Sequence, residues 1–154
     1  LCDTTGMANP MQVAQLCEAV LVQAPALRLT VHFHNTRGMG LANALAAWKV
    51  GVVRFDASLG GLGGCPYAPG ATCNVCTEDR VHRFAAMRCE TGVDLPSLLA
   101  VSRSLPAIVG HDVPGQVMKA GPSDRVYPRP SAHPTLDFDN ALKQAASQGF
   151  LGGP

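Results

Sequence analysis

The sequence predicts an α/β fold built from parallel βαβ units. Segments with the two-residue alternation of strands and segments with the periodicity of helices follow one another at a repeat of about 25 residues. The order is strand end, helix, strand, helix, strand, helix, helix, which is typical of a parallel sheet covered by helices. The chain has 154 residues, of which 47% are hydrophobic and 15% charged. This composition favours a compact domain with a buried core over a disordered chain.

The charge balance argues against several classes of partner. Lys and Arg number 12 and Asp and Glu number 11, so the formal net charge is +1. No global field would attract nucleic acid or an anionic membrane, and we expect neither as a partner. A local basic pocket for a phosphorylated ligand stays possible. Residues 57–77 are uncharged, but they are rich in glycine and small polar residues and do not resemble a membrane span.

The first elements are predicted from caps and periodicity. The sequence opens on LCDTTG, which resembles the end of a strand, so we expect the protein's true N-terminus to lie upstream. Asn9 and Pro10 form an N-cap followed by proline at the first helical position, and the helix should end near Pro25. Four apolar residues at helical spacing form its inner face: Val13, Leu16, Cys17 and Val20.

The next elements are a strand over residues 29–34 and a helix after Gly38–Gly40. In the strand, apolar side chains alternate with Thr30, His32 and His34. The helix should end at Gly51. The apolar residues expected against the helix layer are Leu29, Val31, Phe33, Leu41, Ala44, Leu45 and Trp48.

The third strand is predicted over residues 52–59, and a long glycine-rich loop follows it. Thr77 is expected to cap a third helix, with Glu78 and Asp79 in its first turn. A fourth helix over residues 96–105 should be capped by Asp94. Residues 110–134 are rich in proline and glycine and suggest a surface arm, and residues 136–150 suggest one last helix.

His32 and His34 form the first candidate site. They lie at the C-terminal end of their strand, on the face opposite the helix layer, which is where active sites of parallel barrels are found. Two imidazoles about 7 Å apart along a strand can bind one metal ion together. The alternative is a pair of polar residues that form hydrogen bonds with their neighbours.

Two aspartates also end strands. Asp3, before Thr4-Thr5-Gly6, is expected either to orient a ligand hydroxyl or to stabilise an Asx-type turn. Asp56 is expected to be structural, as a buried partner of Arg54 or of a backbone amide.

The six cysteines suit a reducing compartment better than a disulfide framework. Cys65, in the glycine-rich loop, is either there by chance or a reactive gating group, and it should react with alkylating agents faster than Cys17 or Cys89, which we expect on helices. Cys73 and Cys76 form a C-x-x-C pair. Without a second pair, zinc or thioredoxin-like chemistry is not expected from it.

Several stretches together resemble 3-hydroxy-3-methylglutaryl-CoA lyase. They are DTTGMANP, VHFHNTRGMGLANALAAWKVGVVRFDASLGGLGGCPYAPGA and NVCTED, and the resemblance runs from about Leu1 to His111, with GHDVPGQV at its end. Related enzymes such as isopropylmalate synthase share the HxH motif but not the GGCPYA loop, which favours the lyase. Cys73 is a departure, because the family usually has glycine at this position.

The resemblance implies a (β/α)8 TIM barrel of the metal-dependent lyase and aldolase type. Residues 1–111 would be its last three or so βα units, and residues 112–154 a Pro/Gly-rich arm and C-terminal extension. By position, His32, His34 and Asn74 would bind Mg or Mn. Cys65 would be the family's active-site loop cysteine, and Asp3 the aspartate of the substrate pocket.

The implied reaction is cleavage of 3-hydroxy-3-methylglutaryl-CoA, an acyl-CoA, to acetoacetate and acetyl-CoA, as in leucine degradation and ketone-body formation. The metal would lower the pKa of the tertiary hydroxyl, His32 or Cys65 would relay protons, and Asp3 would orient the hydroxyl. The family's first strand, with an arginine and a metal-binding aspartate, has no counterpart here, so we expect residues 1–154 alone to be inactive.

Three alternatives to a 3-hydroxy-3-methylglutaryl-CoA lyase stay open. They are a lyase for another 3-hydroxy-3-substituted glutaryl-CoA, a related Claisen-type enzyme, and a catalytically dead scaffold or assembly partner. The resemblance further implies that the full-length enzyme is a homodimer, cytoplasmic if bacterial and mitochondrial if eukaryotic.

Overall fold

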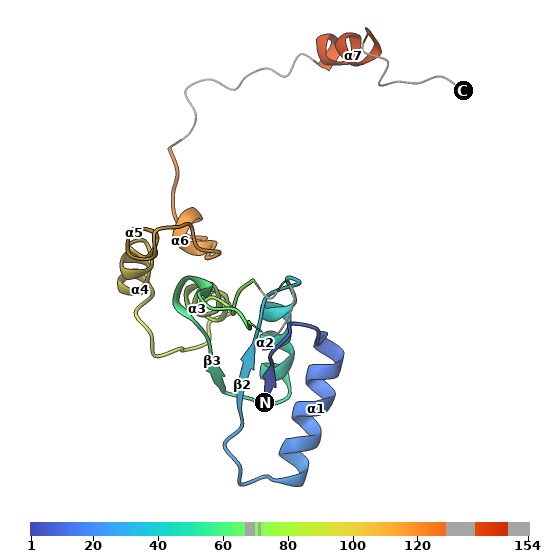
Figure 1. Ribbon diagram of the computed structural model, residues 1–154, viewed down its shortest axis with the longest axis vertical. Helices are drawn as coiled ribbons and strands as arrows, with labels where there is room; N and C mark the ends of the chain where they lie inside the picture. Colours follow the sequence, from blue (N-terminus) through green and yellow to red (C-terminus); the bar gives the residue numbers. More distant parts are fainter. Residues whose placement is uncertain (67–69, 71, 129–137, 148–154) are drawn as a thin grey trace, which may run out of the picture. The chain divides into compact units, whose positions relative to one another are not determined.

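The computed structural model describes residues 1–66, 70, 72–128 and 138–147. The chain forms two compact units, residues 1–124 and 125–154. The first unit contains a three-stranded sheet with its helices (Figure 1). The second contains helix α7 (Phe138–Ser147), which lies inside the range predicted for the last helix.

The sheet consists of β1 (Cys2–Asp3), β2 (Thr30–Phe33) and β3 (Arg54–Asp56), in the order β1-β2-β3. Both pairs of strands are parallel, and a helix lies between consecutive strands in the sequence. This is the arrangement of consecutive βα units, so the predicted α/β fold is confirmed. The third strand is shorter than predicted, because the chain leaves the sheet after Asp56 and forms a 3-10 turn, η1 (Leu59–Gly61).

Helices α1 (Pro10–Gln23) and α2 (Gly40–Lys49) pack on one side of β2 (Figure 1). Asn9 caps α1 as predicted, and its side chain accepts a hydrogen bond from the amide of Gln12, whose side chain in turn accepts from the amide of Asn9. The core between these helices and the sheet consists of Val13, Cys17, Val31, Phe33, Ala44, Ala47, Val52 and Val75. Since Val31 and Phe33 belong to the core, the strand face predicted for the helix layer is confirmed.

Helix α3 (Thr77–Ala86) begins one residue earlier than predicted. Cys76 is the N-cap residue and Thr77 is already helical, so the prediction that Thr77 caps the helix is wrong. The cap forms no side-chain hydrogen bond. Cys89 lies beyond the last helical residue, which corrects its expected place on a helix.

The predicted fourth helix is two helices, α4 (Leu95–Ser102) and α5 (Leu105–Val109). Pro106 has no amide proton to continue the ladder, and this explains the break. Asp94 is the N-cap of α4, as predicted. Helix α6 (Val117–Ala120) follows. A second core cluster joins these helices: Leu99, Leu105, Val113 and Met118.

The prediction of a surface arm over residues 110–134 is wrong for Val113 and Met118, which are only 1% and 5% exposed. Their burial was not apparent in the sequence, because proline and glycine interrupt the apolar periodicity around them. Residues 129–134 of this stretch lie outside the described part of the chain.

Candidate functional site

His32 and His34 lie together at the C-terminal end of β2. Their ring centroids are 5.1 Å apart, with the rings edge to face at 74°. His34 is buried, and His32 is half-buried on the face of the strand opposite the core residues. The two imidazoles therefore share one face, which is the condition for binding one ion.

Asn74 is brought beside His34 by a segment that follows the glycine-rich loop. The amide of Val75 donates to the carbonyl of Phe33 (3.1 Å), and His34 and Asn74 form an isolated antiparallel bridge. The same segment accepts from the amide of Ser58, just after β3. A residue 40 positions away in the sequence thus lies next to the second histidine, as the proposed ligand set requires.

Two buried atoms of this site have no hydrogen-bond partner: Nδ1 of His34 and Oδ1 of Asn74. The amide orientation of Asn74 is defined, because its Nδ2 donates to the carbonyl of Leu62 at 2.8 Å. Leaving buried polar atoms unsatisfied costs about 1–3 kcal/mol each. An imidazole nitrogen and a carbonyl oxygen are both ligands for divalent ions. The residues present therefore fit a divalent metal.

The side chain of His32 contacts Asp56. Its Nδ1 lies 3.1 Å from Oδ2 of Asp56, which is the register partner of His32 on β3. The prediction that Asp56 partners Arg54 or a backbone amide is therefore wrong. Sequence spacing within a single strand could not reveal this contact, because it depends on the register between two strands.

The carboxylate of Asp3 is directed to the loop that follows it. Oδ1 accepts from the amide of Met7 (3.0 Å) and Oδ2 from the amide of Ala8 (3.1 Å). These hydrogen bonds agree with the second of the two roles predicted for Asp3, in which its carboxylate stabilises the turn. Its role toward a substrate hydroxyl stays a prediction.

The glycine-rich loop lies against the segment that carries Asn74. Gly61 and Gly63 have φ of +71° and +93°, and the amide of Asn74 donates to the carbonyl of Gly61 at 3.2 Å. A Cβ on Gly63 would lie 2.9 Å from Nδ2 of Asn74, so a larger residue here would force the Asn74 side chain to shift. Cys65 is half-buried in the same loop. Tyr67 lies outside the described residues.

Glu78 and Asp79 have a role that the sequence analysis missed. Glu78 is fully buried, and its carboxylate accepts from the amide of Gly60 at 3.1 and 3.0 Å. Asp79 accepts from the amides of Gln116 and Val117, at the start of α6. The two acids therefore hold the glycine-rich loop and α6 to α3. In the sequence, only the Thr77-Glu78-Asp79 motif indicated that these two acids have a role beyond the first turn of the helix.

The thiol of Cys76 lies beside this acidic pair. Burial, together with the negative charges of Asp79 and Glu78, raises its pKa well above the ordinary value. These surroundings therefore disfavour the thiolate of Cys76, which is the form that acts as a nucleophile or metal ligand.

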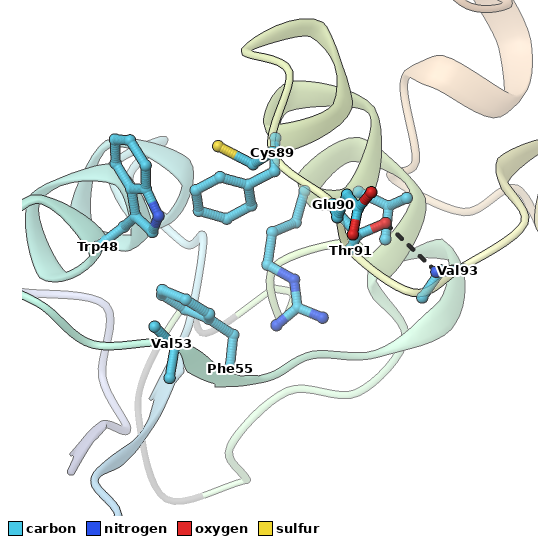
Figure 2. Close-up of a pocket in the computed structure, with 10 residues that line it drawn as sticks. Trp48, Val53, Phe55, Cys89, Glu90, Thr91 and Val93 are labelled. Atoms are coloured by element: carbon cyan, nitrogen blue, oxygen red, sulfur yellow. Dashed lines mark hydrogen bonds between the residues drawn. The ribbon is translucent and has the colours of Figure 1, made fainter.

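A cavity of about 250 Å³ lies on the helix side of β3, against Phe55 (Figure 2). Trp48 and Phe55 form aromatic walls, and Cys89 and Thr91 line it as well. Arg80 stacks on Phe55 with its Cζ 5.6 Å from the ring centroid, and burial lowers the pKa of its guanidinium. The cavity is separate from the histidine site, because Phe55 and Asp56 alternate along β3.

Within residues 1–66, 70, 72–128 and 138–147, no group of three or more His, Cys, Asp or Glu side chains is arranged to bind a metal. The candidate centre is consistent with this finding, since its third member is an amide. The same ranges contain no helix of the length and hydrophobicity needed to span a membrane.

Comparison with known proteins gives one family model, described as HMGL-like, which matches residues 1–105. The chain is 53% identical over 129 residues to (R)-citramalyl-CoA lyase of Chloroflexus aurantiacus, covering 84% of this chain and 40% of that protein. It is 45% identical over 114 residues to a hydroxymethylglutaryl-CoA lyase of Bacillus subtilis, covering 74% of this chain and 38% of that protein. The chain thus spans about two fifths of the length of these relatives.

Among solved structures, an HMG-CoA lyase from Acinetobacter baumannii in complex with coenzyme A and 3-methylmalate has a TM-score of 0.80. The two sequences are 55% identical, and the match covers 84% of this chain and 43% of that chain.

Proposed function

The chain belongs to the HMGL-like family, and on this premise we propose that it forms part of a divalent-metal-dependent carbon–carbon lyase. The proposed reaction is cleavage of 3-hydroxy-3-methylglutaryl-CoA to acetoacetate and acetyl-CoA. The observation that best supports this function is the pair of unpartnered atoms, Nδ1 of His34 and Oδ1 of Asn74, beside His32 at the C-terminal end of a parallel strand.

His32, His34 and Asn74 would bind the Mg or Mn ion. When bound, such an ion lowers the pKa of the tertiary hydroxyl of the substrate and polarises its oxygen. All three protein ligands are neutral. Full compensation of the metal charge therefore needs a carboxylate from another part of the protein, as the resemblance to the family implies.

Protons would be moved by Cys65 and His32. Cleavage of the C2–C3 bond leaves an electron pair on C2 of the acetyl-CoA fragment, and a general acid must protonate that carbon. Cys65 is half-buried in a loop at the same end of the sheet, and glycines with positive φ let this loop adopt its path. Asp3 would orient the hydroxyl through lone pairs that the amides of Met7 and Ala8 leave available.

A second candidate substrate is citramalyl-CoA, because the relative from Chloroflexus aurantiacus is 53% identical to this chain. Both substrates carry a methyl group and a hydroxyl on the carbon that becomes a ketone. They differ in the acid on that carbon, which is carboxymethyl in one and carboxyl in the other. Cleavage of both gives acetyl-CoA, but the second product is acetoacetate from the first and pyruvate from the second.

The test joins residues 1–154 to the part of the Chloroflexus aurantiacus enzyme that the chain does not cover. Closing a parallel barrel takes eight strands, and the described part of this chain contains three. We expect the chimera to cleave one of the two thioesters in the presence of Mn²⁺ or Mg²⁺, and residues 1–154 alone to be inactive. Acetoacetate as the ketone product supports the first substrate, and pyruvate supports the second.

The control is a pair of histidine variants in the chimera. His34→Ala should lower turnover by at least about 100-fold, since removing even an outer-shell partner of a metal costs 10–100-fold. His111→Ala, at an exposed position outside the site, should leave turnover within about threefold of the parent. Equal turnover of the two variants would contradict the metal centre. The proposal extends to a homodimeric enzyme, in the cytoplasm or in mitochondria according to its source.

A further inference from the structure

We propose that Asp56 is a positioning residue for His32. Its carboxylate holds the imidazole in the tautomer that carries the proton on Nδ1, so that Nε2 presents a lone pair to the metal. The inference rests on the proposed function only for the metal. The contact between Asp56 and His32 is a property of the described structure.

The contact follows from the register of the sheet. His32 of β2 and Asp56 of β3 are direct partners across the parallel pair, so their side chains lie on the same face of the sheet. Nδ1 of His32 and Oδ2 of Asp56 are 3.1 Å apart, within hydrogen-bond distance. Both residues point away from the core side of the strands, toward the side that carries His34.

The chemistry of the pair determines the tautomer. An ionised carboxylate only accepts hydrogen bonds, so the bond to Asp56 requires the proton of a neutral His32 to be on Nδ1. The other nitrogen, Nε2, then keeps its lone pair. A histidine that binds a metal typically donates its second ring N–H to a carboxylate or carbonyl, which fixes its tautomer and ring orientation.

The ring of His34 restrains the same imidazole from a second direction. It lies edge to face with His32 at a centroid distance of 5.1 Å. Asp56 and His34 together limit the rotation of the His32 ring. Asp3, the other aspartate at a strand end, directs its carboxylate to the backbone amides of Met7 and Ala8.

The solvent exposure of the pair determines the expected size of the effect. The side chain of Asp56 is 65% exposed and that of His32 is 25% exposed. Water competes for an exposed carboxylate, so Asp56 should contribute at the lower end of the 10–100-fold range found for outer-shell partners. We expect removal of the carboxylate to weaken metal binding about tenfold with little change in folding.

The experiment compares the ¹⁵N resonances of His32 and the Mn²⁺ affinity in residues 1–154 and in Asp56→Ala. In the parent, the long-range ¹H–¹⁵N correlation should show a protonated Nδ1 and an unprotonated Nε2. In Asp56→Ala, the proton should be shared between the two nitrogens, and the Mn²⁺ dissociation constant from water-proton relaxation should rise about tenfold. Asp56→Asn, which keeps an acceptor oxygen without the charge, should give intermediate values.

The matched control is Asp112→Asn, another exposed carboxylate, whose partner is Lys119. It should change neither readout, and circular dichroism should show that every variant is folded. An Nε2-protonated His32 in the parent, or an unchanged tautomer and affinity in Asp56→Ala, would overturn the proposal. A tautomer that changes as expected in a parent without Mn²⁺ affinity supports the contact and counts against the metal centre of the proposed function.

Discussion

The ends of β1 and β3 present the same residue type in two different roles. Each strand ends on an aspartate, and the two strands flank the histidine strand on either side. The carboxylate of Asp3 binds the amides of its own following loop, whereas that of Asp56 reaches across the sheet to His32. Residue type and position in a strand therefore do not define the role of a strand-end acid.

The difference arises from the amides that follow each strand. After Asp3, the chain turns into the start of α1, and the amides of Met7 and Ala8 are available to bind its carboxylate. After Asp56, the amide of Ser58 donates to Val75 and the amide of Gly60 donates to Glu78. These two amides are therefore engaged elsewhere, and Asp56 instead contacts a side chain on the neighbouring strand.

The largest effect that tests this comparison is on stability. Asp3→Ala should lower the free energy of unfolding by about 2 kcal/mol, because the half-buried amide of Ala8 and the exposed amide of Met7 lose a charged acceptor. Asp56→Ala should lower it by less than about 0.5 kcal/mol, since an exposed ion pair contributes little. Urea unfolding followed by circular dichroism measures both values.

An Asp3→Asn variant refines this test. It keeps one acceptor oxygen and should lose about half as much stability as Asp3→Ala, roughly 1 kcal/mol. Equal losses of unfolding free energy for Asp3→Ala and Asp56→Ala would contradict the comparison. They would mean that the amide bonds of Asp3 stabilise the fold no more than the contact of Asp56 with His32.

A smaller effect is expected from the loop that follows β3. Gly63→Ala places a Cβ 2.9 Å from Nδ2 of Asn74 and should displace this ligand, raising the Mn²⁺ dissociation constant about fivefold to tenfold. Gly38→Ala is the matched control, because Gly38 also has positive φ (+73°) but has no atom within 4 Å of the added Cβ. Both should lose about 1 kcal/mol of stability from backbone strain.

Comparing the Gly63 and Gly38 variants separates the displacement of Asn74 from the backbone strain that both variants share. Titration of both variants with Mn²⁺ should show weaker binding for Gly63→Ala alone. Equal affinities would show that Asn74 either tolerates the displacement or does not bind the ion.

The smallest effect concerns the cysteines. The structure changes the prediction that Cys65 reacts faster than Cys89, because Cys89 lies beyond the end of α3 and both thiols are half-buried. Their alkylation rates should lie within about threefold of each other. Cys17 is fully buried and burial raises its pKa, so it should stay unlabelled in the folded protein. Mass spectrometry after a timed iodoacetamide pulse measures all three, and early labelling of Cys17 would contradict the core as described.

The sequence alone was sufficient for the elements that depend on local chemistry and periodicity. The cap at Asn9, the alternation that separates Val31 and Phe33 from His32 and the βαβ order all appear in the structure as predicted. Such features are encoded within a few consecutive residues, and their physical causes act over the same short distances. The resemblance to the lyase family was likewise contained in the motifs.

Only the tertiary structure decided which side chains meet. The partner of Asp56 depends on the register between two strands 24 residues apart. The place of Asn74 depends on hydrogen bonds that its segment forms with β2 and with the turn after β3. The burial of Val113 and Met118 depends on the packing of α4, α5 and α6 together. These outcomes arise from contacts between segments far apart in the chain, and no local pattern determines them because each segment supplies only one half of each contact.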